Sequence, residues 1–308
     1  MIVRQVSGYV TMKKTPGYRT AFTGACMLFA LSSGLAQGTN RVTILVDAFS
    51  QSATLEQDWG FAALIEYEGK RILFDTGNNA DIFANNTKAL GVDLTRLDFV
   101  IISHRHGDHT DGLRHLLKIN PGVKIYVPND EYFGGPTPMG FFRRKEPSLP
   151  AHMRYFGGEV PKQVPHGSPW PQDNMIRIDS SAQVLPGITI VRNIAQVRLF
   201  GETPELSLAI QTPRGQLLVV GCSHPGIEQI LGSIAAKQNP VYLLVGGLHL
   251  VQTPQPELDR LVRSLRDEWK VTNIAPGHCT GEGGFISLQQ GFGTRYQYAG
   301  LGTRIDLP

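Results

Sequence analysis

The sequence lacks the features that identify membrane-spanning proteins, repeat proteins and serine hydrolases. Its longest apolar run, residues 25–31, is too short to span a bilayer stably. It contains no internal repeat, no low-complexity tract and no G-x-S-x-G motif, so neither a repeat architecture nor a serine-hydrolase elbow is indicated. Only 18% of its 308 residues are charged, whereas 41% are hydrophobic. This composition is typical of a globular protein with enough material for one large core.

The first 36 residues have the pattern of an export signal. A basic region with Lys13, Lys14 and Arg19 precedes the apolar run, and small residues at 34–36 follow it. A buried N-terminal helix is the alternative interpretation. We expect a leader and signal peptide that ends near Ala36, and a periplasmic or secreted chain without a stable membrane anchor. The remaining residues, 37–308, are expected to form a single domain.

Removal of this leader changes the interpretation of charge and cysteine content. Residues 1–36 carry four basic residues and no acidic ones, so the formal net charge falls from +3 to −1. The charge balance therefore does not indicate a nucleic-acid partner. Of the three cysteines, Cys222 and Cys279 remain, and export would place them in an oxidising compartment.

Hydrophobic periodicity predicts an α/β fold. The early strands come mostly as hairpins, and the later strands alternate with helices. Two packed sheets with helices on their outer faces would account for both patterns. Residues 134–171 break the rhythm with many prolines and glycines, as a functional cover or mobile loop does. Strands are expected at 41–47, 61–67, 71–75, 98–103, 124–128, 175–179, 188–193, 206–212, 216–221, 241–247 and 271–276, and helices at 78–91, 111–119, 225–237 and 256–269.

Potential metal ligands are concentrated where the strand at 98–103 ends. His104 and His106 are two positions apart in extended chain, so their side chains are expected on the same side. The chain then turns at Gly107 into a helix, which redirects Asp108 and His109. Imidazole and carboxylate groups are ligands that Zn²⁺ accepts. The first pair is therefore predicted to bind one metal ion and the second pair another beside it.

This stretch resembles the H-x-H-x-D-H motif of the metallo-β-lactamase superfamily, and further segments match in the superfamily's order. ILFDTG (72–77) resembles the motif in which an aspartate, Asp75 in this chain, orients metal-binding histidines. APGHCTG (275–281) resembles the segment whose histidine, His278, completes the second metal site. The resemblance implies an α/β fold of the αββα four-layer type over residues 41–308.

Two segments depart from the general pattern of that superfamily. GETPELS places Glu202 where the third histidine ligand of the first metal is common, and GCSHPG places Cys222 where a bridging aspartate is common. His224, two residues after Cys222, is the preferred third ligand of the first metal. Glu202 could still be a ligand or support one. Cys222 could bridge as a thiolate, donate a weak hydrogen bond or only pack.

Four segments, ALIEYEGKRILFDTG, GCSHPGIEQI, GGLHL and GHCTG, resemble the subfamily of metal-dependent hydrolases similar to 7,8-dihydropterin-6-yl-methyl-4-(β-D-ribofuranosyl)aminobenzene-5′-phosphate synthase. The resemblance implies two divalent metal ions, with Zn²⁺ expected and Mn²⁺ or Fe as alternatives. One ion would be held by His104, His106 and His224. The other would be held by Asp108, which is also the expected catalytic residue, His109 and His278.

The expected activity is hydrolysis of a small ester, lactone or phosphoester by a hydroxide that bridges the two metals. An iron-dependent redox enzyme and a non-catalytic metal-binding protein are the alternatives. His249 in GGLHL follows a strand and could contact substrate, support a ligand or simply pack. Arg143, Arg144 and Phe142 in the cover are expected to bind an anionic, aromatic substrate. Alternatively, the cover is a solvated loop whose basic residues only aid solubility.

Overall fold

The computed structural model describes residues 39–130, 146–159, 174–197 and 201–308, apart from isolated positions near the N-terminus. All of its strands and helices belong to the compact unit Gln37–Pro308. The predicted leader and the greater part of the predicted cover lie outside the described residues. None of the helices in the described ranges combines the length and the apolar character that crossing a membrane requires.

Two sheets form the middle of this unit. The first sheet contains, in spatial order, β13 (Arg304–Asp306), β1 (Arg41–Val46), β2 (Ala62–Tyr67), β3 (Lys70–Phe74), β4 (Phe99–Ile101), β5 (Ile125–Pro128) and β6 (Met175–Ile178). The second contains β12 (Asn273–Gly277), β11 (Val241–Gly247), β10 (Gly215–Val220), β9 (Gly201–Thr212), β8 (Ile188–Val197) and β7 (Ala182–Leu185). Strands β3 to β6 run parallel, as do β10 to β12, and the other pairs are antiparallel.

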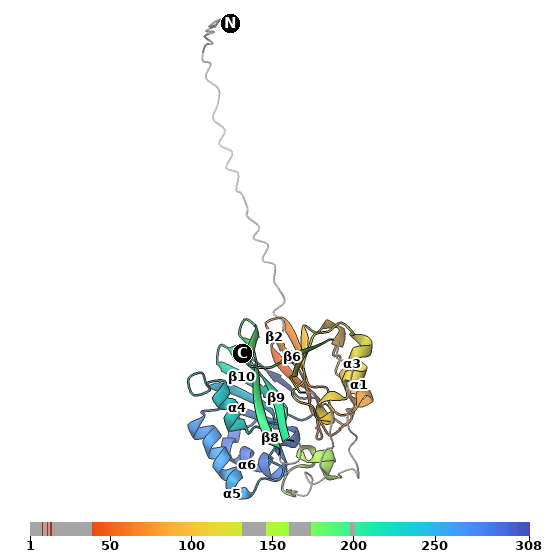
Figure 1. The fold of residues 1–308 in the computed structure, drawn as a ribbon, viewed down its shortest axis with the longest axis vertical. Coiled ribbons are helices and arrows are strands. Elements are labelled where there is room, and N and C mark those ends of the chain that lie inside the picture. The colour runs from red at the N-terminus through yellow and green to blue at the C-terminus, as the bar shows by residue number, and fades with distance from the viewer. Residues whose placement is uncertain are drawn as a thin grey trace. The chain divides into compact units, whose positions relative to one another are not determined.

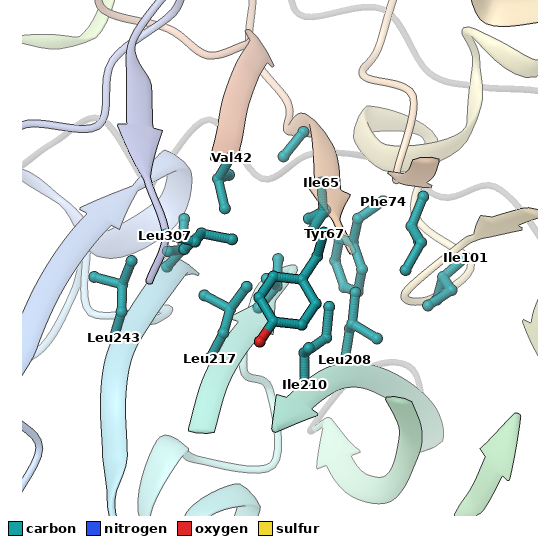
Figure 2. Close-up of a cluster of buried hydrophobic side chains, with 14 of the residues drawn as sticks. Val42, Ile65, Tyr67, Phe74, Ile101, Leu208, Ile210, Leu217, Leu243 and Leu307 are labelled. Carbon is teal, nitrogen blue, oxygen red and sulfur yellow. The ribbon is translucent and has the colours of Figure 1, made fainter. Parts of the chain in front are cut away.

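The core lies between the two sheets, because alternate residues of each strand point inward. In β2, Ala63 and Ile65 enter this core, whereas Ala62 and Leu64 face the opposite side. Figure 2 shows side chains of the first sheet, such as Phe74, meeting side chains of the second. Apolar side chains from both sheets pack together in this interior, so burial of apolar surface is a main source of its stability.

Helices cover the outer faces of both sheets (Figure 1). The outer face of the first sheet packs against α1 (Ala80–Ala89) and α3 (Leu113–Ile119). The outer face of the second packs against α4 (Ile227–Ser233), α5 (Gln255–Arg263) and α6 (Glu282–Phe292). Asn79 caps α1 by accepting hydrogen bonds from the backbone of Asp81 and Ile82. The four layers confirm the predicted αββα sandwich.

Several element boundaries differ from the sequence prediction. The expected helix 111–119 corresponds to α3, which begins at Leu113, and a separate short helix, α2 (Gly107–Thr110), precedes it and contains Asp108 and His109. Strand β9 begins at Gly201 instead of residue 206, because it pairs along its length with β8 in a long hairpin. The sequence prediction missed β7, β13 and α6. Helix α6 contains Gly283 and Gly284, which have low helix propensity, and tertiary packing overrides that preference.

Candidate metal centre

The candidate site lies where loops from both sheets meet at the carboxyl ends of parallel strands, the usual position of ligand sites in such sheets. Asp75 follows β3, and residues 103–109 follow β4. Cys222–His224 follows β10, and His278 follows β12. Gly221 permits the close approach of the two sheets, because a Cβ atom there would come within 2.3 Å of Ser103 Oγ. Residues distant in sequence therefore meet at one edge.

The first candidate ligand group brings together His104, His106 and His224, the three residues expected to hold the first metal. His104 Nε2 lies 3.0 Å from His106 Nδ1. The ring of His224 lies with its centroid 4.7 Å from that of His104 and 4.9 Å from that of His106. Ligand atoms of His104, His224 and Cys222 lie within 4.8 Å of one another. These residues could hold one metal ion.

The second ligand group contains Asp108, His109 and His278. His109 Nε2 and His278 Nε2 are 3.2 Å apart. Asp108 Oδ2 lies 3.3 Å from His278 Nε2 and 3.7 Å from His109 Nε2. Cys222 Sγ is 3.2 Å from His109 Nε2, and its thiol therefore belongs to both groups. A thiolate at this position could bridge two ions.

Asp75 orients His109 directly, and His104 through Ser103, by hydrogen bonds on the side of the rings away from the site. Its carboxylate accepts hydrogen bonds from the Ser103 backbone N–H at 2.6 Å and from Ser103 Oγ at 2.7 Å. It also lies 2.7 Å from His109 Nδ1, so His109 Nε2 is the nitrogen directed into the site. Ser103 Oγ is 2.8 Å from His104 Nδ1 and orients that ring in the same way. Such contacts fix the tautomer and direction of metal-binding histidines.

Glu205, which sequence reasoning missed, supports His224. Its buried carboxylate accepts hydrogen bonds from the backbone N–H groups of Cys222, Ser223 and His224 at 3.1, 2.6 and 2.9 Å. It also lies 2.9 Å from His224 Nδ1. Glu202, the predicted alternative, is exposed and accepts a hydrogen bond from Gln196 at 3.3 Å. Within the described ranges, Glu202 belongs to none of the groups of closely spaced ligand atoms.

The protonation preferences of the histidines suit a metal site. Burial and the neighbouring rings hold the pKa of His104 well below its usual value, and burial together with His224 lowers the pKa of His106 to about 3. Neutral imidazole is the form that ligates metals. Burial opposes protonation of His109 too, but Asp108 and Asp75 raise its pKa to about 9. These two carboxylates attract a positive charge, which a metal ion would supply in place of the proton.

The backbone of the site is strained. Asp75, Ser223 and His278 have φ angles of 57°, 64° and 49°, in the left-handed region that side chains other than glycine rarely occupy. Such conformations cost about 1–3 kcal/mol each and cluster at functional sites. They turn the chain sharply after β3, β10 and β12, so that the following groups face the shared edge.

Residues 146–159, the described part of the predicted cover, pack beside the second ligand group. Tyr155 donates a hydrogen bond from its hydroxyl to the carbonyl of His278 and accepts one from the backbone of Gly281. Its ring packs edge to face against Trp59, whose own ring centroid lies 4.7 Å from that of His278. This part of the segment therefore holds the His278 loop. Arg143, Arg144 and Phe142 lie outside the described residues.

The donor set fits divalent metal ions. Imidazole, carboxylate and thiol groups converge from both sheets, and nitrogen with sulfur donors suits ions of borderline softness such as Zn²⁺. The grouping would be costly without a cation, because buried ring nitrogens face one another and Asp108 is buried among them. His249 lies beside the first group, with its ring centroid 4.4 Å from that of His224.

Comparisons with known proteins agree with this geometry. The family model of the metallo-beta-lactamase superfamily matches residues 60–265. The Methanocaldococcus jannaschii protein 7,8-dihydropterin-6-methyl-4-(beta-D-ribofuranosyl)-aminobenzene-5′-phosphate synthase is 28% identical over 268 residues, which cover 78% of this chain and 86% of that protein. The resemblance to this synthase that the sequence motifs predicted is thereby confirmed.

Solved structures show the same fold. Tm1679, a metal-dependent hydrolase of the beta-lactamase superfamily, superposes with a TM-score of 0.66 at 23% identity, covering 87% of this chain and 99% of that one. The metallo-beta-lactamase fold protein YhfI from Bacillus subtilis gives a TM-score of 0.52 at 13% identity, with coverage of 86% and 99%. The family model spans more than half of the chain, and this chain therefore belongs to the metallo-β-lactamase superfamily, whose fold implies divalent-metal binding.

Proposed function

We propose that the protein is a hydrolase that uses two divalent metal ions, with Zn²⁺ as the expected metal, on a small ester, lactone or phosphoester. The observation that carries this proposal is the convergence of six predicted ligands into two adjacent groups that share Cys222. Superfamily membership supports hydrolysis as the reaction class. Two bound ions would supply Lewis-acid polarisation of a substrate oxygen and a water nucleophile of lowered pKa.

The chain's own residues set up this chemistry. Asp75 and Glu205 hold the rings of His109 and His224 by their Nδ1 atoms, which leaves each Nε2 free to act as a ligand. Asp108 brings a carboxylate to the second group, with Oδ2 3.3 Å from His278 Nε2 and 3.7 Å from His109 Nε2. Burial raises the pKa of Asp108, but the charges of those two histidines outweigh that effect and keep it ionised.

The substrate is proposed to carry an anionic group. The arginines of the cover support this idea, as does the phosphate in the name of the M. jannaschii relative. A small molecule, and no nucleic acid, is the proposed partner. The leader-like residues 1–36 support export as the proposed route of the chain.

The test is a panel of chromogenic carboxylic esters, lactones, phosphomonoesters and phosphodiesters, run while the bound metal is measured. We expect turnover that disappears on chelation, returns with Zn²⁺ or Mn²⁺, and is nearly abolished by Asp108→Ala. Asp111→Ala is the matched control, because Asp111 lies at the end of the same short helix but pairs with Arg114 at 2.7 Å. Turnover that survives both chelation and Asp108→Ala would refute metal-dependent hydrolysis.

A further inference from the structure

A third group of potential ligands lies at the ends of three adjacent parallel strands. Cys222 follows β10, His249 follows β11 and Cys279 follows β12. One ligand atom from each residue lies within 4.8 Å of those from the other two. Cys279 and His249 belong to neither of the two groups described above, whereas Cys222 is common to all three.

The surroundings of this group favour ligation over simple packing. Cys279 is fully buried, and its Sγ donates a long hydrogen bond of 3.6 Å to the carbonyl of Cys222. Gly247 keeps this space open, because a Cβ atom there would come within 2.8 Å of Cys279 Sγ. His249 adopts a φ angle of 53°, a strained conformation for a histidine that places it after the sharp turn from β11.

Two small cavities lie beside His249. One of about 310 Å³ is lined by His249 and His224 together with Thr253 and other residues of the α4 and α5 region. A second of about 340 Å³ is lined by His249, Val251 and Gln252. Both exceed the roughly 30 Å³ that one water molecule occupies in the liquid. They leave room beside His249 for a ligand that does not come from the protein.

We propose that Cys222, His249 and Cys279 form a third metal site, selective for a soft or borderline ion such as Zn²⁺ or Cd²⁺. Two thiolates and one imidazole are a donor set that selects such ions over Mg²⁺ or Mn²⁺. Two cysteines and a histidine with a fourth position for an exogenous ligand make a known type of zinc site. This site does not depend on the hydrolytic activity proposed above, although it shares the Cys222 sulfur with the two other groups.

The test is a Cd²⁺ titration of the full chain after metal removal, in buffer that keeps the thiols reduced. Bound cadmium is counted by mass spectrometry of the metal, and thiolate ligation is followed by its ultraviolet charge-transfer absorption. The informative variants are Cys279→Ser and His249→Ala, because these residues belong only to the third group. His115→Ala is a matched control, since His115 lies on α3 against Phe83.

We expect about three equivalents of Cd²⁺ for the unmodified chain and for His115→Ala, and about two for each third-site variant. Cys279→Ser should also lose a large part of the charge-transfer absorption. Saturation of the unmodified chain at two equivalents would overturn the proposal, as would binding of three equivalents by both third-site variants. His249 is only half-buried, so His249→Ala keeps the test decisive if Cys279→Ser does not fold.

The outcome can be separated from that of the proposed function. Asp108→Ala removes a ligand of the second group but none of the third. Loss of hydrolysis in that variant, with the cadmium ion of the third site still bound, would support both proposals. Persistent hydrolysis in Asp108→Ala would refute the proposed mechanism without affecting the cadmium count.

Discussion

Replacement of Glu205 by glutamine should weaken metal binding although Glu205 is not itself a predicted ligand. The carboxylate of Glu205 accepts three backbone N–H groups and faces His224 Nδ1, and it is 1% exposed. Glutamine keeps one oxygen but presents an NH₂ group where the second oxygen stood. That group would face N–H donors, so two of the hydrogen bonds would be lost and His224 would no longer be held in its ligating orientation.

The same hydrogen bonds give the size of the effect in two ways. Each hydrogen bond to a charged group is worth about 1.5–3 kcal/mol, so the loss of two costs about 3 kcal/mol or more. Burial raises the pKa of Glu205, but the hydrogen bonds and charge of His224, with the backbone N–H groups, lower it from 4.5 to about 2. At about 1.4 kcal/mol per pKa unit, this difference also corresponds to about 3 kcal/mol.

The sign of the pH dependence follows from the lowered pKa. The stabilisation from Glu205 is fully present above pH 4.5, the unperturbed value, and is lost as the pH falls toward about 2. Metal-free Glu205→Gln should therefore be less stable than the unmodified chain at neutral pH, and this difference should shrink in acid. Metal affinity at neutral pH should fall about 10- to 100-fold, as it does when supporting residues of metal ligands are replaced.

Chelator competition measures the affinity, and denaturant unfolding between pH 3 and pH 7 measures the stability. Glu202→Gln is the matched control, because Glu202 lies three positions away on the same strand but is exposed. It should change neither quantity by more than about 0.5 kcal/mol. Equal metal affinity in the two variants, or a larger loss in Glu202→Gln, would refute the assignment of Glu205 as the residue that supports His224.

Three further changes test other parts of the site. Burial, with smaller contributions from nearby acids, raises the pKa of Asp58 to about 7. The unfolding free energy of the metal-free protein should therefore fall by up to about 4 kcal/mol as the pH rises from 4 to 7. Denaturant unfolding of Asp58→Asn should show a smaller fall over the same pH range. Tyr155→Phe removes the hydroxyl that forms hydrogen bonds with the backbone of His278 and Gly281. The substitution should lower the unfolding free energy by about 1–3 kcal/mol and weaken metal binding in chelator competition. Unchanged values would contradict the role of Tyr155 in holding the His278 loop. Chelation should lower the melting temperature of the unmodified chain measurably in calorimetry, because metal binding stabilises the folded state, and an unaltered melting temperature would argue against tightly bound metal.

Much of the fold could be predicted because strand alternation is strong in this sequence. In β9, for example, Leu206, Leu208 and Ile210 point into the core between the sheets at every second position. The predicted strands and helices that lie in described ranges occur with shifted ends. The elements that were missed depend on partners elsewhere in the chain: β13 pairs with β1, and α6 packs against α5.

The ligand motif could be predicted, but its supporting residues could not. His104 to His109 are adjacent in sequence, and local geometry alone indicates two pairs of donors. Glu205 becomes visible only when the register of β9 is known, because it has the opposite parity to the core residues of that strand and faces the loop after β10. An acidic residue next to an alternating apolar run was the available signal. That Glu202 is exposed also depends on the long hairpin of β9 with β8, which the sequence prediction missed.

The core between the sheets stabilises the fold, whereas the edge that carries the candidate ligands destabilises it. The core between the sheets gains free energy from apolar side chains, whereas the edge that carries the ligands contains buried carboxylates and left-handed residues, Asp75, Ser223, His249 and His278. Each left-handed residue costs about 1–3 kcal/mol, so the four together approach the total stability of an ordinary domain. Only a large core can support such an edge. Bound metal would return part of this cost, because it neutralises the carboxylates and fixes the strained loops in the conformation that they already adopt.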